Sequence, residues 1–528
     1  MSTEKNSPAE SRWTTYSWLL LILAAAAALR LWVFVGVVGS DDIVIANLAQ
    51  RLLESGPWVP DNHYQARIGL TYPLAVVYAF FGVGEWQTVA LPFFASLVSV
   101  FLTFLIARRL CGDTVGLLAA LVIAVFPLDV AAATQLMPDL PLGAVIAAAF
   151  YFALRATDGE GSRGWAIAAG LTWGCAYLIK VEAVFIGLPL AILFLMHLKQ
   201  WRVLSLIFVS AALVFFTESF VYWVAGGDTV QRLHSVTNQG NLRVTEEYSA
   251  GQLWVFPKSW FITFYEFGLH YYLLFAAIVW AVLGRVKALY VIVAWAVIYL
   301  LWLQFGGNPF SANYHVKSHL DRYCSMLSVP MAILVGAFLT QLLEWRKRVG
   351  AVVLTVTLLA AVFFISFNTL SFERQQATKL AIDHARKENL FPLYMDRTSY
   401  LLAGIYMHGD QRLADVHQAQ GYDFNARKTI IEDFDTLDGY VLLNRGFMEY
   451  AWNRYRMDKV DVSTVDASRE VFSVDNPGSA LAYAQAKLLY GASRLIPVAF
   501  LRDKIGGTAE GLLRPDDVVI LDFTKTAR

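Results

Sequence analysis

Long apolar segments recur through the first two thirds of the chain, and short polar stretches separate them. A run of about 20 apolar residues can cross a bilayer as an α-helix. The pattern predicts about twelve spans, several of them short, at 17–38, 70–82, 87–107, 114–128, 138–154, 165–179, 183–197, 203–224, 260–283, 288–305, 323–343 and 349–368. The first run is too long for a signal-peptide core and lacks a small-residue cleavage site, so we expect a retained anchor.

The pattern changes after residue 368. Segment 369–528 is polar, and its apolar runs have the length of strands, as in YVLLN at 440–444 and DVVILDF at 517–523. Stretches of helical period lie between these runs, which is typical of an α/β domain. We therefore predict a polytopic α-helical membrane domain over 1–368 and a small soluble α/β domain over 369–528.

Composition agrees with a membrane protein. The 528 residues are 57% hydrophobic and 16% charged, whereas soluble domains are about 25% charged. The formal net charge is zero, which gives no reason to expect a nucleic-acid partner. The three cysteines show no metal-binding or disulfide spacing, and we interpret them as small core residues.

Basic residues predict the orientation in the membrane, because cytoplasmic loops are enriched in Lys and Arg. They occur before the first span and then in every second loop: Lys5, Arg12, Arg108, Arg109, Arg155, Arg163, Lys199, Arg202, Arg285, Lys287, Arg346, Lys347 and Arg348. We expect a multi-pass protein of the plasma (inner) membrane with a cytoplasmic N-terminus. The outward segments are then 39–69, 129–137, 180–182, 225–259, 306–322 and the C-terminal domain.

Two adjacent carboxylates, Asp41 and Asp42, open the stretch DDIVIANLAQRLLES at 41–55. Its apolar residues are spaced as on one face of a helix, which predicts an amphipathic helix on the outer membrane surface. Either acid could be an ordinary N-cap of that helix. Two acids are more than a cap needs, so a catalytic role is the alternative.

Further charged residues are predicted at the same outer face. Asp139 lies between two prolines at the start of a span, where an acid also suits the positive end of a helix. Lys180 and Glu182 form a short outer turn, either as a simple ion pair or with Lys180 binding an anionic head group. Arg30 lies inside the first span, where we expect it to pair with an acid or a carbonyl group.

The stretch NYHVKSHLDRYCSMLSVP at 313–330 enters a late span from outside. Its polar residues could form an ordinary interfacial belt. His315 and His319 are four apart, but two histidines without a matched carboxylate are weak support for a metal site. The guanidinium of Arg322 suits a phosphate group, because it offers a fork of donors.

Acids and bases at an outer membrane face favour a group-transfer enzyme with a lipid-linked substrate. If the donor is a sugar on a polyprenyl phosphate, the leaving phosphate needs cations, for which Lys180 and Arg322 are candidates. The acceptor hydroxyl needs a general base, and Asp41 is our candidate. One base with in-line displacement inverts the sugar carbon, while Asp42 and Asp139 would position the reacting groups.

Several motifs, in order over about 15–345, resemble those of GT-C membrane glycosyltransferases of the dolichyl-phosphate-mannose–protein mannosyltransferase and lipid A aminoarabinose transferase type. They are LRLWVF with DDIVIANLAQRLLESG, the segment FGVGEWQTVALPFFASLVSVFLTFLIARRLCGDTVGLLAALVIAVFP, then MPDLPLGAV, LIKVEAVFIGLPLAI and HLDRYCSMLSVPMAIL. Gln135 departs from the family, where a basic residue is common, and so does Glu182.

The resemblance implies roles for individual residues. Asp41 would be the catalytic acid with Asp42 beside it, and Asp139 the second acid. Lys180 and Arg322 would meet the lipid phosphate. We expect His319 and Tyr323 at the same phosphate, and we expect three further residues at the substrate, namely Arg67, Glu182 and His315. The resemblance favours catalysis without a cofactor, although Asp41, Asp42 and Asp139 could hold a divalent cation.

Two other classes of function remain open at this stage. An O-antigen ligase or polymerase also uses lipid-linked sugars, but the acidic pair after the first span argues against it. A transporter or lipid flippase would place its charges near the bilayer midplane, often within a repeat, and no repeat is visible here. The expected partners are the lipid-linked donor, membrane lipids and a lipid, glycan or protein acceptor.

Overall fold

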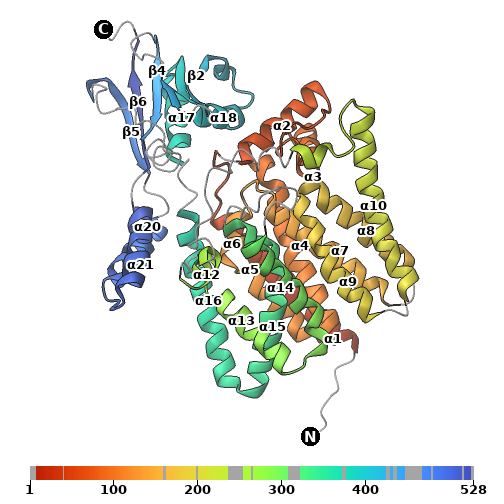
Figure 1. Ribbon diagram of the computed structural model, residues 1–528. Coiled ribbons are helices and arrows are strands. Elements are labelled where there is room, and N and C mark those ends of the chain that lie inside the picture. The colour runs from red at the N-terminus through yellow and green to blue at the C-terminus, as the bar shows by residue number, and fades with distance from the viewer. Residues whose placement is uncertain are drawn as a thin grey trace. The chain divides into compact units, whose positions relative to one another are not determined.

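The computed structural model describes residues 8–39, 41–158, 162–197, 200–235, 254–262, 266–306, 321–370, 376–423, 428–431, 437–445, 467–476, 480–513 and 516–524. The chain divides into two compact units, whose elements are labelled in Figure 1. The first unit comprises Met1–Phe34, Arg51–Val76 and Ala90–Ile365, and the second comprises Val35–Gln50, Val77–Val89 and Ser366–Arg528. The second unit thus contains two short segments of the predicted membrane domain besides the C-terminal segment.

The first unit is built from apolar helices. Its elements, including those that begin or end in the second unit, are α1 (Pro8–Trp32), α3 (Ile68–Phe81), α4 (Glu85–Cys111), α5 (Asp113–Ala124), α6 (Pro127–Ala132), α7 (Asp139–Ala156), α8 (Ser162–Ile179), η1 (Val181–Ile186), α9 (Gly187–Met196), α10 (Trp201–Val224), α12 (Val255–Phe261), α13 (His270–Leu283), η5 (Lys287–Leu289), α14 (Tyr290–Phe305), η6 (Asp321–Leu327), α15 (Ser328–Trp345) and α16 (Lys347–Leu370). Every predicted span overlaps at least one of these helices, and several spans, such as 183–197, 260–283 and 323–343, overlap two elements.

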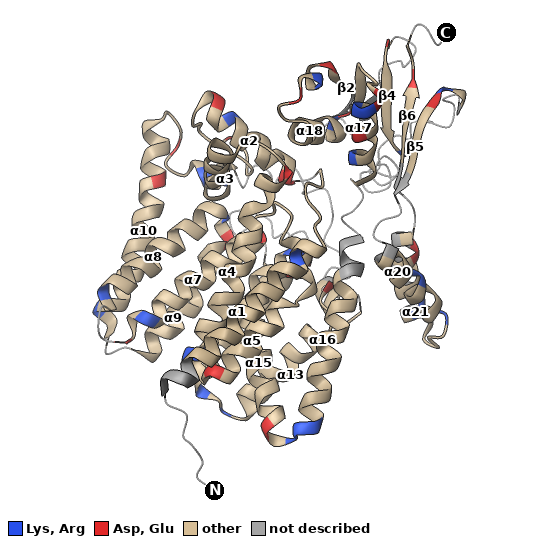
Figure 2. Cartoon of the chain, turned by 180° about the vertical axis from the view of Figure 1, so that it is seen from behind, with Lys and Arg blue, Asp and Glu red and all other residues tan. Residues whose placement is uncertain are grey.

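Seven stretches of the described chain are long and apolar enough to cross a membrane, and four shorter apolar helices accompany them. The prediction of a mostly helical membrane protein is therefore confirmed, whereas the count of twelve spans stays a prediction. Figure 2 shows charged residues of these helices mainly near their ends. That distribution is expected of helices whose middle parts lie in lipid.

Small residues let the helices of this unit approach closely. Gly336 of α15 faces α5, and a Cβ at this position would lie 2.7 Å from the backbone nitrogen of Ala119. Large aromatic side chains fill the remaining space, as where Phe150 and Trp295 lie with ring centroids 4.8 Å apart. Close backbone contact and dense packing drive helix association in lipid, where the hydrophobic effect contributes little.

The second unit contains a six-stranded mixed sheet of order β3-β2-β1-β4-β6-β5. Its elements are α2 (Asp41–Ser55), α17 (Gln376–Glu388), β1 (Leu393–Asp396), α18 (Arg397–Tyr406), η8 (Gln411–Asp415), β2 (Val416–Asp423), β3 (Lys428–Ile431), β4 (Tyr440–Asn444), η11 (Ala467–Arg469), β5 (Glu470–Asn476), α20 (Ala480–Ser493), α21 (Ala499–Leu513) and β6 (Asp516–Asp522). Strand β1 pairs in parallel with β2 and β4, and the other pairings are antiparallel.

Both faces of this sheet carry apolar side chains. Alternate residues of one strand point to opposite faces, so one apolar strand contributes to both. Leu442 and Ile520 pack with Ile382 of α17 on one face. Val441 and Leu521 belong to a separate buried cluster. The predicted small α/β region is therefore confirmed, and helix α17 is its link to the preceding span. The domain boundary at 368 itself stays a prediction.

The close approach of α5 and α15 is testable by adding one methyl group. Gly336→Ala places the Cβ 2.8 Å from the Cα of Ala119, so the two helices must move apart. We expect a loss of about 1–3 kcal/mol, seen as a lower midpoint of thermal unfolding in detergent. Gly164→Ala is the matched control, because no heavy atom lies within 4 Å of its added Cβ. Equal midpoints for the two variants would contradict the tight contact.

Candidate active site

A buried ion-pair cluster lies where α7, the end of α8 and η6 meet. Asp139 is in the first turn of α7, and its side chain is 1% exposed. Lys180 follows the last residue of α8, and its Nζ donates to Asp139 Oδ1 at 2.8 Å. Arg322 of η6 places its Nε 3.5 Å from Asp139 Oδ2. Two cations from distant parts of the sequence therefore compensate one buried carboxylate.

Two glycines allow the elements around this cluster to approach. Gly143 lies one turn after Asp139, and a Cβ there would be 3.1 Å from the carbonyl oxygen of Ser325 in η6. Gly69 of α3 faces the end of α8, where a Cβ would be 2.7 Å from the nitrogen of Ile179. Larger residues at these two positions would separate the elements that carry the charges.

The surroundings keep Lys180 cationic. Burial alone would lower its pKa, but the negative charges of Asp139 and Glu182 raise the pKa above its ordinary value. Glu182 Oε1 lies 3.6 Å from Lys180 Nζ. The ring centroid of Tyr323 is 4.1 Å from the same nitrogen, a cation–π contact. The charge of Arg67 acts in the opposite sense on this pKa.

Two arginines also lie close to this group. The charge of buried Arg67 acts on Lys180, and Arg322 pairs with Asp139. The side chain of Arg322 is 24% exposed, compared with 9% for Lys180. Its guanidinium is thus the more accessible of these two cations, and such a fork of donors suits an anionic oxygen group.

The acidic pair belongs to the second unit and is described within it. Asp41 is half-buried and Asp42 is fully buried at the start of α2. The Oδ2 of Asp42 accepts the backbone N–H of Val38 at 2.6 Å. Helix α2 buries Ile43 and Ile45, while its predicted place on the outer membrane surface stays a prediction. Asp42 therefore holds the backbone before the helix, and Asp41 is the more accessible carboxylate.

Two sequence predictions concern segments that are incompletely described. His315 and His319 lie outside the described residues, so their suggested contact with substrate or phosphate stays a prediction. The outer loop predicted at 225–259 is described only over 225–235 and 254–259. The assignment of the remaining site residues to donor or acceptor also stays a prediction.

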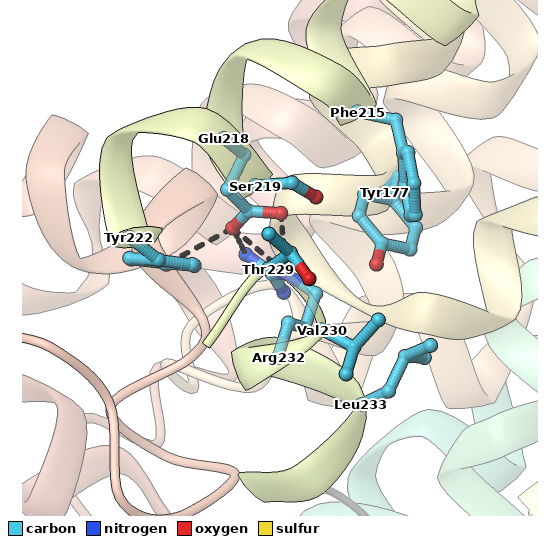
Figure 3. Close-up of a pocket in the computed structure, with 9 residues that line it drawn as sticks. All are labelled: Tyr177, Phe215, Glu218, Ser219, Tyr222, Thr229, Val230, Arg232 and Leu233. Atoms are coloured by element: carbon cyan, nitrogen blue, oxygen red, sulfur yellow. Dashed lines mark hydrogen bonds and ion pairs between the residues drawn. The ribbon is translucent and has the colours of Figure 1, made fainter. Parts of the chain in front are cut away.

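A second buried ion pair anchors the beginning of this outer loop (Figure 3). Arg232 Nε donates to both carboxylate oxygens of Glu218, at 2.8 and 2.9 Å. The hydroxyl of Tyr222 donates to Glu218 Oε1 at 3.0 Å, and Arg232 lies over the ring of Tyr177. Glu218 was missed in the sequence, although a lone acid inside an apolar span is a signal that a partner is needed.

Arg30 finds its partners inside the helix bundle. Its Nε donates to Ser96 Oγ at 2.7 Å, and its Nη1 donates to the carbonyl oxygens of Ala26 and Ala124, each at 3.0 Å. The expectation of carbonyl partners is thus confirmed. Asp129 of α6, which accepts a hydrogen bond from Ser328 and was not singled out in the sequence, also interacts electrostatically with Arg30.

Known proteins are similar to this chain in sequence or in fold. Residues 68–223 match the family profile described as dolichyl-phosphate-mannose-protein mannosyltransferase. No curated protein sequence matches the chain. Among solved structures, ArnT from Cupriavidus metallidurans in the apo state is similar with a TM-score of 0.55 and 17% identity, covering 84% of this chain and 95% of that one. The same protein bound to undecaprenyl phosphate gives 0.54 and 16%, with 83% and 95% covered.

A second solved protein, with lower sequence identity, has a similar fold. The apo oligosaccharyltransferase of Archaeoglobus fulgidus gives a TM-score of 0.51 at 12% identity, covering 89% of this chain and 71% of that one. The resemblance seen in the motifs is therefore confirmed: the chain has the GT-C fold of membrane glycosyltransferases. Together with the matched family region, this fold supports a glycosyltransferase.

Among the described residues, no three His, Cys, Asp or Glu side chains gather as a metal site. Lys180 and Arg322 lie beside Asp139, and cationic side chains of this kind can neutralise an anionic substrate group.

The charge balance of the Asp139 cluster predicts a stability effect. Lys180→Met removes the ammonium group that contacts both Asp139 and Glu182, so these two carboxylates lose their shared partner. We expect a loss of about 3–5 kcal/mol in the free energy of unfolding. Adding Asp139→Asn to that variant removes one of the carboxylates and should recover part of the loss. The measurement is thermal or denaturant unfolding in detergent.

Lys387 is an exposed lysine of α17, so Lys387→Met is the matched control for the loss of a lysine charge. If the double variant is no more stable than Lys180→Met alone, the loss reflects packing of the lysine chain and contradicts the charge argument.

Proposed function

We propose that this protein transfers a sugar from a polyprenyl-phosphate donor to an acceptor hydroxyl at the outer face of the membrane. The observation that carries the proposal is the Asp139 cluster, in which buried Lys180 and the partly exposed Arg322 lie beside one carboxylate. It occurs in a chain with the GT-C fold, and one similar structure holds undecaprenyl phosphate.

The proposed chemistry assigns the cations to the leaving group. A polyprenyl phosphate departs with its negative charge already stable, so it needs no general acid. Lys180 and Arg322 would offset the charge that develops on the phosphate as the bond to the sugar breaks. Tyr323 would hold the lysine in place through its ring. We propose that this charge compensation works without a divalent cation.

The general base in this proposal is Asp41. Asp42 uses one carboxylate oxygen to accept the backbone N–H of Val38 and is fully buried. Asp41 is more accessible, so it is the better candidate to accept the proton of the acceptor hydroxyl. Attack from the side opposite the leaving phosphate would invert the configuration at the sugar carbon. The acceptor, whether lipid, glycan or protein, stays open within this proposal.

Transfer by Asp41→Asn tests the proposal. Native membranes containing the full-length protein are supplied with radiolabelled undecaprenyl-phosphate hexoses and pentoses, and label transferred to acceptor is measured per folded protein. Loss of the base should reduce the rate by about 10²–10⁴-fold. Chelator should leave the transfer rate of the wild-type protein unchanged, because the proposed cations are side chains of the protein.

Glu54→Gln, an exposed acid on the same helix α2, is the matched control and should retain the wild-type rate. Transfer by Asp41→Asn at the wild-type rate would refute the assignment of the base. Loss of wild-type transfer on addition of chelator would refute the metal-free mechanism.

A further inference from the structure

The linker between α1 and α2 is buried although it has no regular secondary structure. Val35 and Val37 are each 1% exposed. Buried backbone N–H and C=O groups are costly unless they find hydrogen-bond partners. Because this linker forms neither a helix nor a strand, the hydrogen-bond partners of its backbone come from other parts of the chain.

The partners come from the start of α4 and from α17 of the C-terminal segment. The carbonyl oxygen of Val35 accepts from Gln376 Nε2 at 3.1 Å and from Lys379 Nζ at 3.5 Å. The N–H of Val37 donates to Glu85 Oε1 at 3.0 Å. All these residues belong to the second unit. The C-terminal helix α17 thus contacts the linker directly.

Glu85 and Lys379 also pair with each other, and the lysine is 4% exposed. Lys379 lies in the first turn of α17, where the helix dipole disfavours a cation. The lysine therefore does not serve the stability of its own helix. Its buried ammonium is compensated by the same Glu85 oxygen that accepts the linker N–H of Val37.

Gly36 completes this arrangement. Its φ of +77° is one that L side chains rarely adopt. A Cβ at this position would also collide with the Glu85 carboxylate and lie 3.0 Å from Lys379 Nζ. The linker can therefore reach the ion pair only with glycine at position 36.

The contacts continue without a break to the acidic pair. Val38 follows Val37, and its N–H donates to Asp42 Oδ2 at 2.6 Å. A path of hydrogen bonds and one peptide link thus runs from Lys379 through Glu85 and the linker to Asp42. Movement of the linker would move Asp42 and the adjoining Asp41.

We propose that Glu85 and Lys379 are positioning residues that hold Asp41 and Asp42 in place through the 35–38 linker. By this proposal the C-terminal domain takes part in building the catalytic site and is more than an appended acceptor-binding module. The inference rests on the proposed function in so far as it makes Asp41 the base. A shift of about 1 Å in a reacting group can reduce a rate by about 100-fold, so such a clamp has kinetic consequences.

The first experiment measures how firmly Glu85 and Lys379 hold the 35–38 linker, without measuring activity. Hydrogen exchange is followed by mass spectrometry on peptides covering residues 35–42 in full-length protein in nanodiscs. Lys379→Met should accelerate exchange in this segment by about 10-fold or more, because the amide of Val37 loses a fixed acceptor. Lys387→Met on the exposed side of α17 should exchange like wild type. Wild-type protection in Lys379→Met would overturn the proposal.

The second experiment measures transfer per folded protein with the undecaprenyl-phosphate sugar that the wild type uses. Lys379→Met should lower kcat by about 10–100-fold and leave the KM for the donor within about twofold. When Lys379→Met is added to Asp41→Asn, kcat should fall by less than about twofold further, because Lys379 acts through a base that is already lost. An equal cost in both backgrounds would overturn the proposal.

Two further outcomes are distinguishable. If Asp41→Asn transfers like wild type while the linker still loses protection in Lys379→Met, the assigned base is wrong and the clamp stands as a structural device. If Lys379→Met does not fold, Glu85→Gln tests the same path, because it keeps an acceptor oxygen for Val37 and removes the ion pair with Lys379. Wild-type kcat and wild-type protection in Glu85→Gln would then overturn the proposal.

Discussion

A charge placed at the end of an apolar helix must find its partner within the protein, because a lone buried carboxylate or ammonium is costly. The rest of the structure depends on this constraint. Asp139 meets it through Lys180 and Arg322, and Glu218 meets it through Arg232. The Asp139 contacts join segments that are separate in the sequence, and they bring together the helix ends at the proposed site.

The same constraint shapes the chemistry that this site can perform. Lys180 and Arg322 lie beside Asp139, and Glu182 and Tyr323 contact Lys180. These contacts hold the two cations in a defined geometry. Such preorganised charge stabilises a developing anion more effectively than mobile charge in water does. That property is what the departure of a lipid phosphate from a sugar would require.

In the second unit an ion pair replaces the regular hydrogen bonds that a buried linker lacks. Glu85 and Lys379 are 294 positions apart in the chain, and together they surround the residues just before Asp41. The C-terminal sheet contributes the rigid platform on which α17 presents Lys379. A soluble domain and an acidic motif near a membrane helix thus become parts of one compact unit.

The helices, the small α/β region and the residue types of the candidate site follow from local patterns in the sequence. Apolar period and bilayer length are local properties, and Lys180, Arg322 and Tyr323 occur in short motifs. Only the tertiary structure decided the partners. Nothing local to Asp139 indicates Arg322, and nothing local to Glu85 indicates Lys379, because these contacts depend on how whole helices pack. Glu218 and Asp129 are acids beside or within apolar segments, which signals that each needs a partner, but the partners Arg232 and Ser328 follow only from the packing.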